Sequence, residues 1–180
     1  MAKATVFLDR DGVLNEDKGY VHKPSDLKIL PGVPEALKEL KRRGYLLVVI
    51  SNQSGVARGK FGISDVDSFH DHLRTELVRL GAPPLDDVFF CPHGPDDGCP
   101  CRKPHTGMID NAVKRHGIDL GRSFLVGDKF DDIQCAVNAG LKGIQVVTTK
   151  EPTQHPQAIA RVGSLKDALA FVPASSSTKP

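Results

Sequence analysis

Short runs of apolar residues alternate with amphipathic stretches along most of the chain. The runs that indicate strands buried in a sheet lie at 6–8, 46–50, 87–90, 124–126 and 143–147. Apolar residues at helical spacing predict helices at 34–43, 64–80, 106–116, 131–139 and 164–171. Strands that alternate with helices in this way predict an α/β fold, a doubly wound parallel sheet with helices on both faces.

Polar residues follow the ends of several predicted strands. They are Asp9 and Asp11 after the first, Ser51 and Asn52 at the second, Arg102 and Lys103 in the loop after the third, and Asp128 after the fourth. Ligands of an open parallel sheet bind beyond the carboxyl ends of its strands. We therefore expect these side chains to form one site at a single edge of the sheet.

The carboxylates at this edge predict a bound cation. Two carboxylates as close in sequence as Asp9 and Asp11 repel one another unless a proton or a metal ion separates their charges. Asp9, Asp128 and the backbone carbonyl of Asp11 offer the oxygen ligands that Mg²⁺ prefers. An isolated Asp-x-Asp-Gly pattern also occurs as a turn that caps its own loop. The polar groups at the other strand ends favour the metal site.

A metal beside hydroxyl, amide and ammonium groups indicates phosphate chemistry. Ser51, Asn52 and Lys103 supply donors to phosphate oxygens, and phosphoryl transfer depends mainly on such electrostatic stabilisation. We assign Asp9 as the nucleophile, which forms an aspartyl phosphate. Asp11 is assigned as the acid that protonates the leaving alcohol and the base that then activates water. The sequence predicts a phosphatase with Asp9, Asp11, Ser51 and Lys103 as catalytic residues.

Composition argues against several other classes of protein. With 180 residues, 39% of them hydrophobic and 26% charged, the chain has the make-up of one ordinary globular domain. A net charge of +2, spread evenly, does not indicate a nucleic-acid groove. The sequence shows no apolar signal region and no membrane-length apolar run, so we expect a cytoplasmic protein with no membrane partner. Without a heptad repeat, we expect a monomer.

Three of the four cysteines gather with a histidine in one loop. Cys91, His93, Cys99 and Cys101 provide three thiolates and one imidazole, which complete a tetrahedral zinc site with no open position. Such a zinc is structural, and it would order a loop rich in glycine and proline beside the predicted site. Disulfide pairing is the alternative, and a reducing compartment disfavours it.

Four motifs occur in a fixed order over residues 6–148. They are Asp-Arg-Asp-Gly at 9–12, Ser51-Asn52, Lys103, and Gly127-Asp128 with Asp132. Together they resemble the motifs of the haloacid dehalogenase superfamily of phosphotransferases. The resemblance implies a Rossmann-like haloacid dehalogenase core, the roles given above, and a place for Asp132 beside the magnesium but not bound to it. Relatives often carry a cap domain, but here only the loops 15–31 and 91–105 are available, so we expect an open site without a cap.

Longer stretches narrow the resemblance. Residues 17–22, 52–61, 91–93, 101–104 and 127–129 are similar to the bacterial D-glycero-D-manno-heptose 1,7-bisphosphate 7-phosphatases, which serve nucleotide-activated heptose synthesis for lipopolysaccharide and other surface glycans. This resemblance implies substrate contacts from Asp17, Lys18, Gly19, Tyr20, Ser51, Asn52, Gln53, Ser54, Arg102, Lys103 and Lys129. The related histidinol-phosphate phosphatases of histidine biosynthesis share the first motif and the cysteine loop. A catalytically inactive, zinc-stabilised binding module is the alternative of another class.

The expected organisation is a single phosphatase domain over 1–173, with the zinc loop at 91–101. A small polar tail at 174–180 is expected to be disordered. The expected cofactors are Mg²⁺ and structural Zn²⁺, and the expected partner is a small sugar bisphosphate. The sequence leaves open which anomer is preferred and whether Arg58, Lys60, His22 or His105 contacts it.

Overall fold

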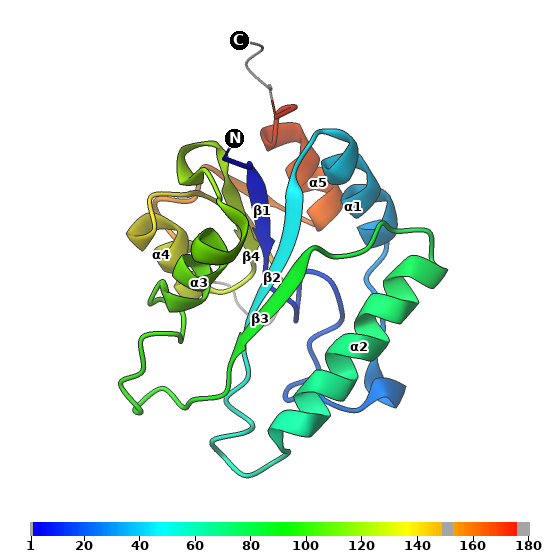
Figure 1. Cartoon of the computed structure of the whole chain (residues 1–180), viewed down its shortest axis with the longest axis vertical. Coiled ribbons are helices and arrows are strands. Elements are labelled where there is room, and N and C mark those ends of the chain that lie inside the picture. The colour runs from blue at the N-terminus through cyan, green and yellow to red at the C-terminus, as the bar shows by residue number, and fades with distance from the viewer. Residues whose placement is uncertain (1, 149–152, 176–180) are drawn as a thin grey trace.

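The structure is a computed structural model that describes residues 2–148 and 153–175. Within these residues, six parallel strands form one sheet (Figure 1). In chain order they are β1 (Thr5–Leu8), β2 (Leu46–Asn52), β3 (Asp87–Cys91), β4 (Phe124–Gly127), β5 (Lys142–Val146) and β6 (Ala160–Val162). Across the sheet the order is β3-β2-β1-β4-β5-β6, and every neighbouring pair is parallel. The predicted doubly wound parallel sheet is confirmed.

Helices cover both faces of this sheet, as the sequence predicts (Figure 1). The α-helices of the described residues are α1 (Val33–Arg42), α2 (Ile63–Arg79), α3 (Gly107–His116), α4 (Phe130–Asn138) and α5 (Leu165–Ala168). Helices α1, α2 and α5 pack on one face, whereas α3 and α4 pack on the other. Short 3₁₀ turns lie at Pro24–Asp26, Leu120–Arg122 and Leu169–Phe171. None of the helices in the described part of the chain is long and apolar enough to span a bilayer.

The central strand β1 divides the core in two. Val6 and Leu8 point to the layer of α1, α2 and α5, and Phe7 points to the layer of α3 and α4. All three side chains are fully buried, and each such burial stabilises the fold by about 1.5–3 kcal/mol. The carboxyl end of β1 is therefore held from both sides, which gives the residues that follow it a rigid support.

The end of the chain differs in detail from the prediction. A single helix was expected at 164–171, but the structure has the short helix α5 followed by a 3₁₀ turn. Phe171, which the prediction counted as part of the apolar face, is 45% exposed. Strand β6 was missed because it has three residues, of which only Val162 is buried, too few for a recognisable pattern. In the expected tail, the Ser175 N–H donates to the Arg43 carbonyl at 2.8 Å, and residues 176–180 lie outside the described residues.

Two loops shape the carboxyl edge of the sheet. The flap loop, residues 15–31, folds back on itself: the Glu16 N–H donates to Lys28 O at 2.9 Å, and the Leu30 N–H to Leu14 O at 3.0 Å. The zinc loop, residues 91–101, follows β3. No described helix or strand forms a separate cap over this edge, in agreement with the prediction.

Candidate active site

Three neighbouring strands bring the predicted residues together at one edge. Asp9 follows β1, and its backbone N–H donates to Val126 O at 2.9 Å, which continues the sheet pairing one residue beyond the strand. Ser51 lies near the end of β2, and Asp128 follows β4 directly. All three side chains are buried. Their positions follow from the parallel order of the strands, whose carboxyl ends lie at the same edge.

A buried lysine joins two of the carboxylates. The Lys103 ammonium lies 2.7 Å from Asp9 Oδ1 and 2.6 Å from Asp132 Oδ1, and it also donates to Ile50 O at 2.8 Å. Burial disfavours its charge, but Asp132 and Asp9 outweigh burial and raise the pKa of Lys103. Burial likewise opposes ionisation of Asp9, yet the charges of Lys103 and Lys129 outweigh it and lower the pKa of Asp9. Asp9 is therefore held as a carboxylate, the form needed for nucleophilic attack.

At the neighbouring Asp128, the charge of Lys129 lowers the pKa but is outweighed. Asp128 Oδ1 is buried and has no hydrogen-bond partner among the described residues. Burial, together with the charges of Asp9 and Asp132, raises the pKa of Asp128 to about 8. Gly12 permits the close packing, because a Cβ there would lie 2.4 Å from Asp128 Oδ2 and its φ is +87°. An unpartnered carboxylate oxygen of this kind fits a bound cation.

Asp11 lies apart from this acidic cluster and is held by four donors. Arg10 Nε donates to Oδ1 at 3.0 Å and Arg10 Nη2 to Oδ2 at 2.6 Å. Asn15 Nδ2 donates to Oδ1 at 2.8 Å, and Gln53 Nε2 to Oδ2 at 3.3 Å. The side chain keeps 15% of its surface exposed and faces the same cavity as Asp9 and Ser51. The four donors thus fix the carboxylate of Asp11 at the wall of the cavity, beside the acidic cluster and not within it.

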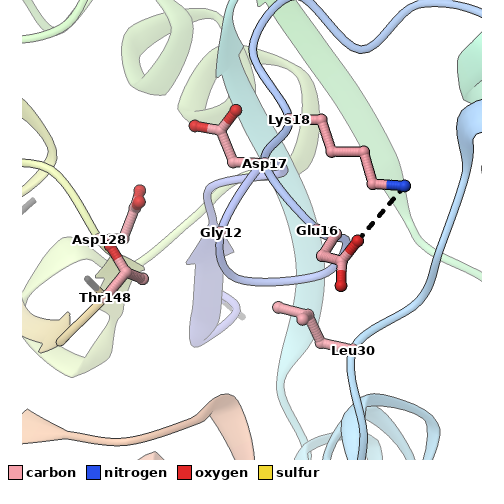
Figure 2. Close-up of a pocket in the computed structure, with 7 residues that line it drawn as sticks. All are labelled: Gly12, Glu16, Asp17, Lys18, Leu30, Asp128 and Thr148. Atoms are coloured by element: carbon pink, nitrogen blue, oxygen red, sulfur yellow. Dashed lines mark ion pairs between the residues drawn. The ribbon is translucent and has the colours of Figure 1, made fainter. Parts of the chain in front are cut away.

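Three adjoining cavities open at this edge. The innermost, of about 110 Å³, is lined by Asp9, Asp11, Ser51, Asn52, Ser54, Arg102, Lys103, Lys129, Asp131 and Asp132. A second, of about 220 Å³, extends to Asp17, Gly19, Tyr20 and Gln53. The third, of about 440 Å³, lies between the flap loop and β4, where Asp17 and Asp128 project from different elements and Lys18 pairs with Glu16 (Figure 2). Every residue predicted to contact substrate lines one of these cavities.

The side-chain amides of two predicted substrate residues, Asn52 and Gln53, form hydrogen bonds within the site. Asn52 Nδ2 donates to Lys103 O at 3.1 Å, and the Lys103 N–H donates to Asn52 Oδ1 at 3.0 Å. Gln53 is buried and donates to Ser51 Oγ at 2.7 Å as well as to Asp11. These amides hold their neighbours in place, and the phosphate contact of Asn52 stays a prediction.

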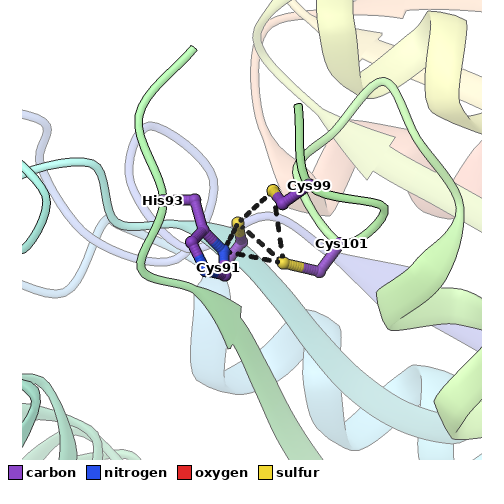
Figure 3. Close-up of side chains that lie close together, drawn as sticks. All are labelled: Cys91, His93, Cys99 and Cys101. Carbon is purple, nitrogen blue, oxygen red and sulfur yellow. Dashed lines mark hydrogen bonds between the residues drawn. The ribbon is translucent and has the colours of Figure 1, made fainter. Parts of the chain in front are cut away.

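The zinc loop carries the predicted cluster of ligands (Figure 3). Cys91 Sγ lies 2.9 Å from Cys101 Sγ and 3.5 Å from Cys99 Sγ, and His93 Nδ1 lies 3.2 Å from Cys101 Sγ. Ligands on a tetrahedral zinc with bonds of about 2.0–2.3 Å are separated by about 3.5–3.8 Å, so a small expansion of the cluster admits the ion. The cysteines are free thiols, and the disulfide alternative is contradicted. The donor set fits structural zinc.

Comparison with known proteins places the chain in a family. The HAD-hydrolase-like family profile matches residues 100–168. A D-glycero-beta-D-manno-heptose-1,7-bisphosphate 7-phosphatase of Helicobacter pylori is 37% identical over 93% of this chain and 95% of its own length. The same-named protein of Haemophilus ducreyi is 43% identical over 83% of this chain and 85% of its own. The chain belongs to the D-glycero-D-manno-heptose-1,7-bisphosphate 7-phosphatase family. The relatives are named 7-phosphatases, and a phosphatase of this kind is a phosphoric monoester hydrolase.

A solved structure of the family shares the fold of this chain and holds magnesium and phosphate. D,D-heptose 1,7-bisphosphate phosphatase from B. bronchiseptica, complexed with magnesium and phosphate, superposes with a TM-score of 0.84 at 34% identity, over 93% of this chain and 97% of that one. In the phosphatase described here, Asp9, Asp128 and Asp132 each offer an oxygen within 4.8 Å of the others. The oxygens around one Mg²⁺ are separated by about 3–4 Å, so Asp9 and Asp128 can share one ion after a small adjustment.

Contacts between two loops shape the outer part of the phosphatase site. The Lys60 ammonium lies 4.6 Å from the centroid of the Tyr20 ring, and the His22 ring stacks on Phe61 at 4.5 Å. Tyr20 adopts a left-handed backbone with φ of 53°. Lys60 and His22, which the sequence left open, therefore join the flap loop to the segment after β2. Arg58 and His105 are exposed and line none of the described cavities at the site.

Sequence reasoning missed the residues that hold the catalytic groups. Arg10 was passed over as the residue between two aspartates, and Asn15 as the start of a loop, although both are fully buried. The position of Arg10 was the available signal. Arg10 directly follows a buried strand, and a cation at such a buried position needs a partner inside the protein. The contacts of Gln53 with Ser51 and Asp11 have no comparable signal in the sequence.

Proposed function

We propose that this chain hydrolyses the 7-phosphate of D-glycero-D-manno-heptose 1,7-bisphosphate through an aspartyl phosphate on Asp9. The observation that carries the proposal is the buried pair of Lys103 and Asp9 beside the unpartnered oxygen of Asp128, within a chain of this family. A carboxylate that is ionised, buried and adjacent to a cation site is suited to attack phosphorus. The same edge offers donors for the phosphate oxygens.

The reaction has two steps, in which Asp9 is first the nucleophile and then the leaving group, and Asp11 is first the acid and then the base. In the first, a carboxylate oxygen of Asp9 forms a bond to phosphorus, the bond to the sugar oxygen breaks, and Asp11 gives that oxygen a proton. In the second, Asp11 takes a proton from water, whose oxygen attacks phosphorus and releases Asp9 and inorganic phosphate. Ser51 and Lys103 donate to the phosphate oxygens in both steps.

Magnesium supplies charge neutralisation when bound. We assign Asp9, Asp128 and the backbone carbonyl of Asp11 as its ligands, and a bound Mg²⁺ neutralises charge on the phosphate and on Asp9. Asp132 is assigned to Lys103 rather than to the metal, because Lys103 contacts Asp132 Oδ1 and the Lys129 N–H donates to its Oδ2 at 3.0 Å. Asp132 thereby fixes the lysine that faces the phosphate.

The rest of the substrate lies toward the flap loop in this proposal. Lys129 lies between the acidic cluster and the flap, with its ammonium 3.5 Å from Asp17 Oδ2. Arg102 donates to His93 O at 3.2 Å and lines the innermost cavity. We assign these two cations to the second phosphate, and the flap residues Asp17, Lys18, Gly19 and Tyr20, together with Ser54, to the sugar hydroxyls. The names of the curated relatives support the β anomer as the preferred substrate.

Other features of the proposal follow from the chain itself. The polar groups of the three cavities come from elements spread over most of the chain, which supports one catalytic domain over 1–173, and we expect this domain to act as a monomer. Three thiolates that bind zinc need a reducing compartment, which supports a cytoplasmic location. A small-molecule partner suffices for this activity, and no nucleic acid or membrane is needed.

Phosphate release tests the proposal directly. Purified protein is assayed with the β and α anomers of the heptose bisphosphate and with histidinol phosphate, each with Mg²⁺ and with a chelator. We expect Mg²⁺-dependent release from the β anomer first, with the 1-phosphate retained in the product, as phosphorus NMR measures. Asp9→Asn should remove turnover while thermal unfolding stays close to that of the wild type. Faster turnover of histidinol phosphate would reassign the substrate, and no release from any ester would indicate an inactive binding module.

A further inference from the structure

A fully buried arginine lies behind the proposed proton donor. Arg10 has no exposed surface, and its guanidinium is divided among three neighbours. Nε and Nη2 form a two-point contact with Asp11 at 3.0 and 2.6 Å, and Nη2 also donates to Val21 O at 2.7 Å. Nη1 lies 3.4 Å from His70 Nε2. A buried guanidinium without partners is strongly unfavourable, so these contacts fix where Arg10 can lie.

Helix α2 provides the support for this arginine. Its Phe69 and His70 are adjacent in sequence, buried, and both turned toward Arg10. The guanidinium carbon lies 4.4 Å from the centroid of the Phe69 ring, a cation–π contact. The ring of His70 packs in turn against Phe90 of β3, with centroids 5.6 Å apart. The arginine is thus enclosed by residues about 60 positions away in sequence.

The chemistry of His70 suits it to accept a hydrogen bond from Arg10. Burial, and the charges of Arg10 and Arg74, lower the pKa of His70 to about 3. His70 is therefore neutral, and because an arginine can only donate, His70 Nε2 acts as the acceptor and Nδ1 carries the proton. This contact uses the one guanidinium nitrogen, Nη1, that neither Asp11 nor Val21 engages.

We propose that Arg10, seated on Phe69 and His70, is the positioning residue that aims the Asp11 carboxylate at the leaving-group oxygen. A two-point guanidinium contact sets both the place and the plane of a carboxylate, which a single ammonium does not. The bond to Val21 O ties the same arginine to the flap loop, just beyond the residues assigned to the sugar. One buried cation thereby fixes proton donor and sugar-binding loop relative to each other. The inference rests on the proposed function only in taking Asp11 as the proton donor.

Comparing two classes of leaving group distinguishes a loss of Asp11 positioning from a general loss of structure. An alkyl oxygen leaves phosphorus slowly without a proton, whereas 4-nitrophenolate leaves readily as an anion. Protonation by a positioned acid contributes about 10²- to 10⁴-fold, and only to the first class. The alkyl phosphates are the heptose bisphosphate and glycerol phosphate. For each of them, the readout is its kcat/KM divided by the kcat/KM for 4-nitrophenyl phosphate. This constant covers the steps up to release of the first product, so later attack by water does not enter it.

Two variants of His70 test the support. His70→Phe removes the acceptor but keeps an aromatic ring, and we expect the ratio to fall about tenfold, a fraction of the full acid contribution. His70→Gln offers Oε1 where Nε2 lies, and we expect it to restore the ratio to within about threefold of the wild type. Asp11→Asn calibrates complete loss of the proton donor. His72→Phe, the same substitution at an exposed position of α2, should leave the ratio unchanged.

Equal losses on both classes of ester would overturn the proposal, because a general loss of structure affects them alike. A His70→Gln variant no better than His70→Phe would overturn it too. Should His70→Phe fail to fold, as thermal unfolding would show, Arg10→Lys replaces it, and its ratio must then fall at least tenfold. A wrong substrate assignment would give a different result. The enzyme would hydrolyse glycerol phosphate, and His70→Phe would lower the ratio for this ester, but the heptose bisphosphate would not be turned over. A wild type that hydrolyses no alkyl phosphate would refute the role of Asp11 itself.

Discussion

Replacing Lys103 by methionine removes a side-chain cation that is bonded to two buried carboxylates of the site. Lys103 is 2% exposed and contacts both Asp9 and Asp132 within 2.7 Å. Truncating one partner of a buried ion pair destabilises a protein by about 3–5 kcal/mol, because the remaining charge is left unpaired. In a chain of this size, 1 kcal/mol lowers Tm by about 2–4 °C, so we expect a decrease of about 6–20 °C.

The pH dependence of this loss identifies its cause. The pKa of Asp9 lies below its ordinary value of 3.8 in the folded protein, so Asp9 contributes stability above that value. The contribution is lost as the pH falls through the lowered pKa. The difference in Tm between wild type and Lys103→Met should therefore be full at neutral pH and shrink below about pH 4.

Thermal unfolding monitored by circular dichroism, in chelator and at a series of pH values, measures both quantities. The matched control is Lys114→Met, at an exposed position of α3, which should change the stability by less than about 0.5 kcal/mol. Phosphatase activity of Lys103→Met should fall about 10²- to 10³-fold, as when one electrostatic stabiliser of a transition state is removed. A variant as stable as Lys114→Met, or a Tm difference that is independent of pH, would refute the reasoning.

Three further outcomes are expected at the same site. Gly127→Ala places a Cβ 2.2 Å from Asp132 Cβ. We therefore expect the free energy of unfolding, measured by urea titration, to fall by about 1–3 kcal/mol and turnover to decrease. Unchanged kinetics would contradict this expectation. Removing zinc with a strong chelator should lower both Tm and activity together, because Lys103 follows the ligand Cys101 by two residues, and readdition of Zn²⁺ should restore both. Since Asp128 has a folded pKa of about 8 against 3.8 unfolded, it binds more protons when folded and weakens the metal-free protein as pH rises from about 4 to 8. Mg²⁺ should therefore raise Tm more at pH 8 than at pH 5.5, and an equal increase would argue against binding at Asp128.

The elements and the position of the site could be predicted because both depend on local pattern. An unbroken apolar run such as 46–50 fits only a strand covered on both faces, and polar residues directly after such runs must lie at the carboxyl edge. Strand β6 offers no such pattern, since one buried residue in three carries little information. The sequence also supports the zinc loop, because its ligands are close together along the chain.

Contacts between distant segments could not be predicted in the same way. Which backbone groups the Asn52 side chain contacts depends on where the segment after the zinc loop returns, about 50 residues later. The contacts of Arg10 with Phe69 and His70 depend on which face α2 turns toward β1. The hydrophobic periodicity of the sequence does not specify that these two side chains point at the active site rather than into the core. Such residues look like ordinary helix positions until the fold brings them together.

The double hydrogen bond between Asn52 and the backbone of Lys103 has a consequence for how this protein tolerates change. It anchors one end of the segment that contains Lys103 to β2, while the zinc ligands anchor the other. The intervening residues 94–98, between His93 and Cys99, are mostly exposed. Insertions or sequence tags placed there should leave turnover intact as long as His93 and Cys99 still bind zinc, because the Asn52 contact holds the Lys103 segment independently.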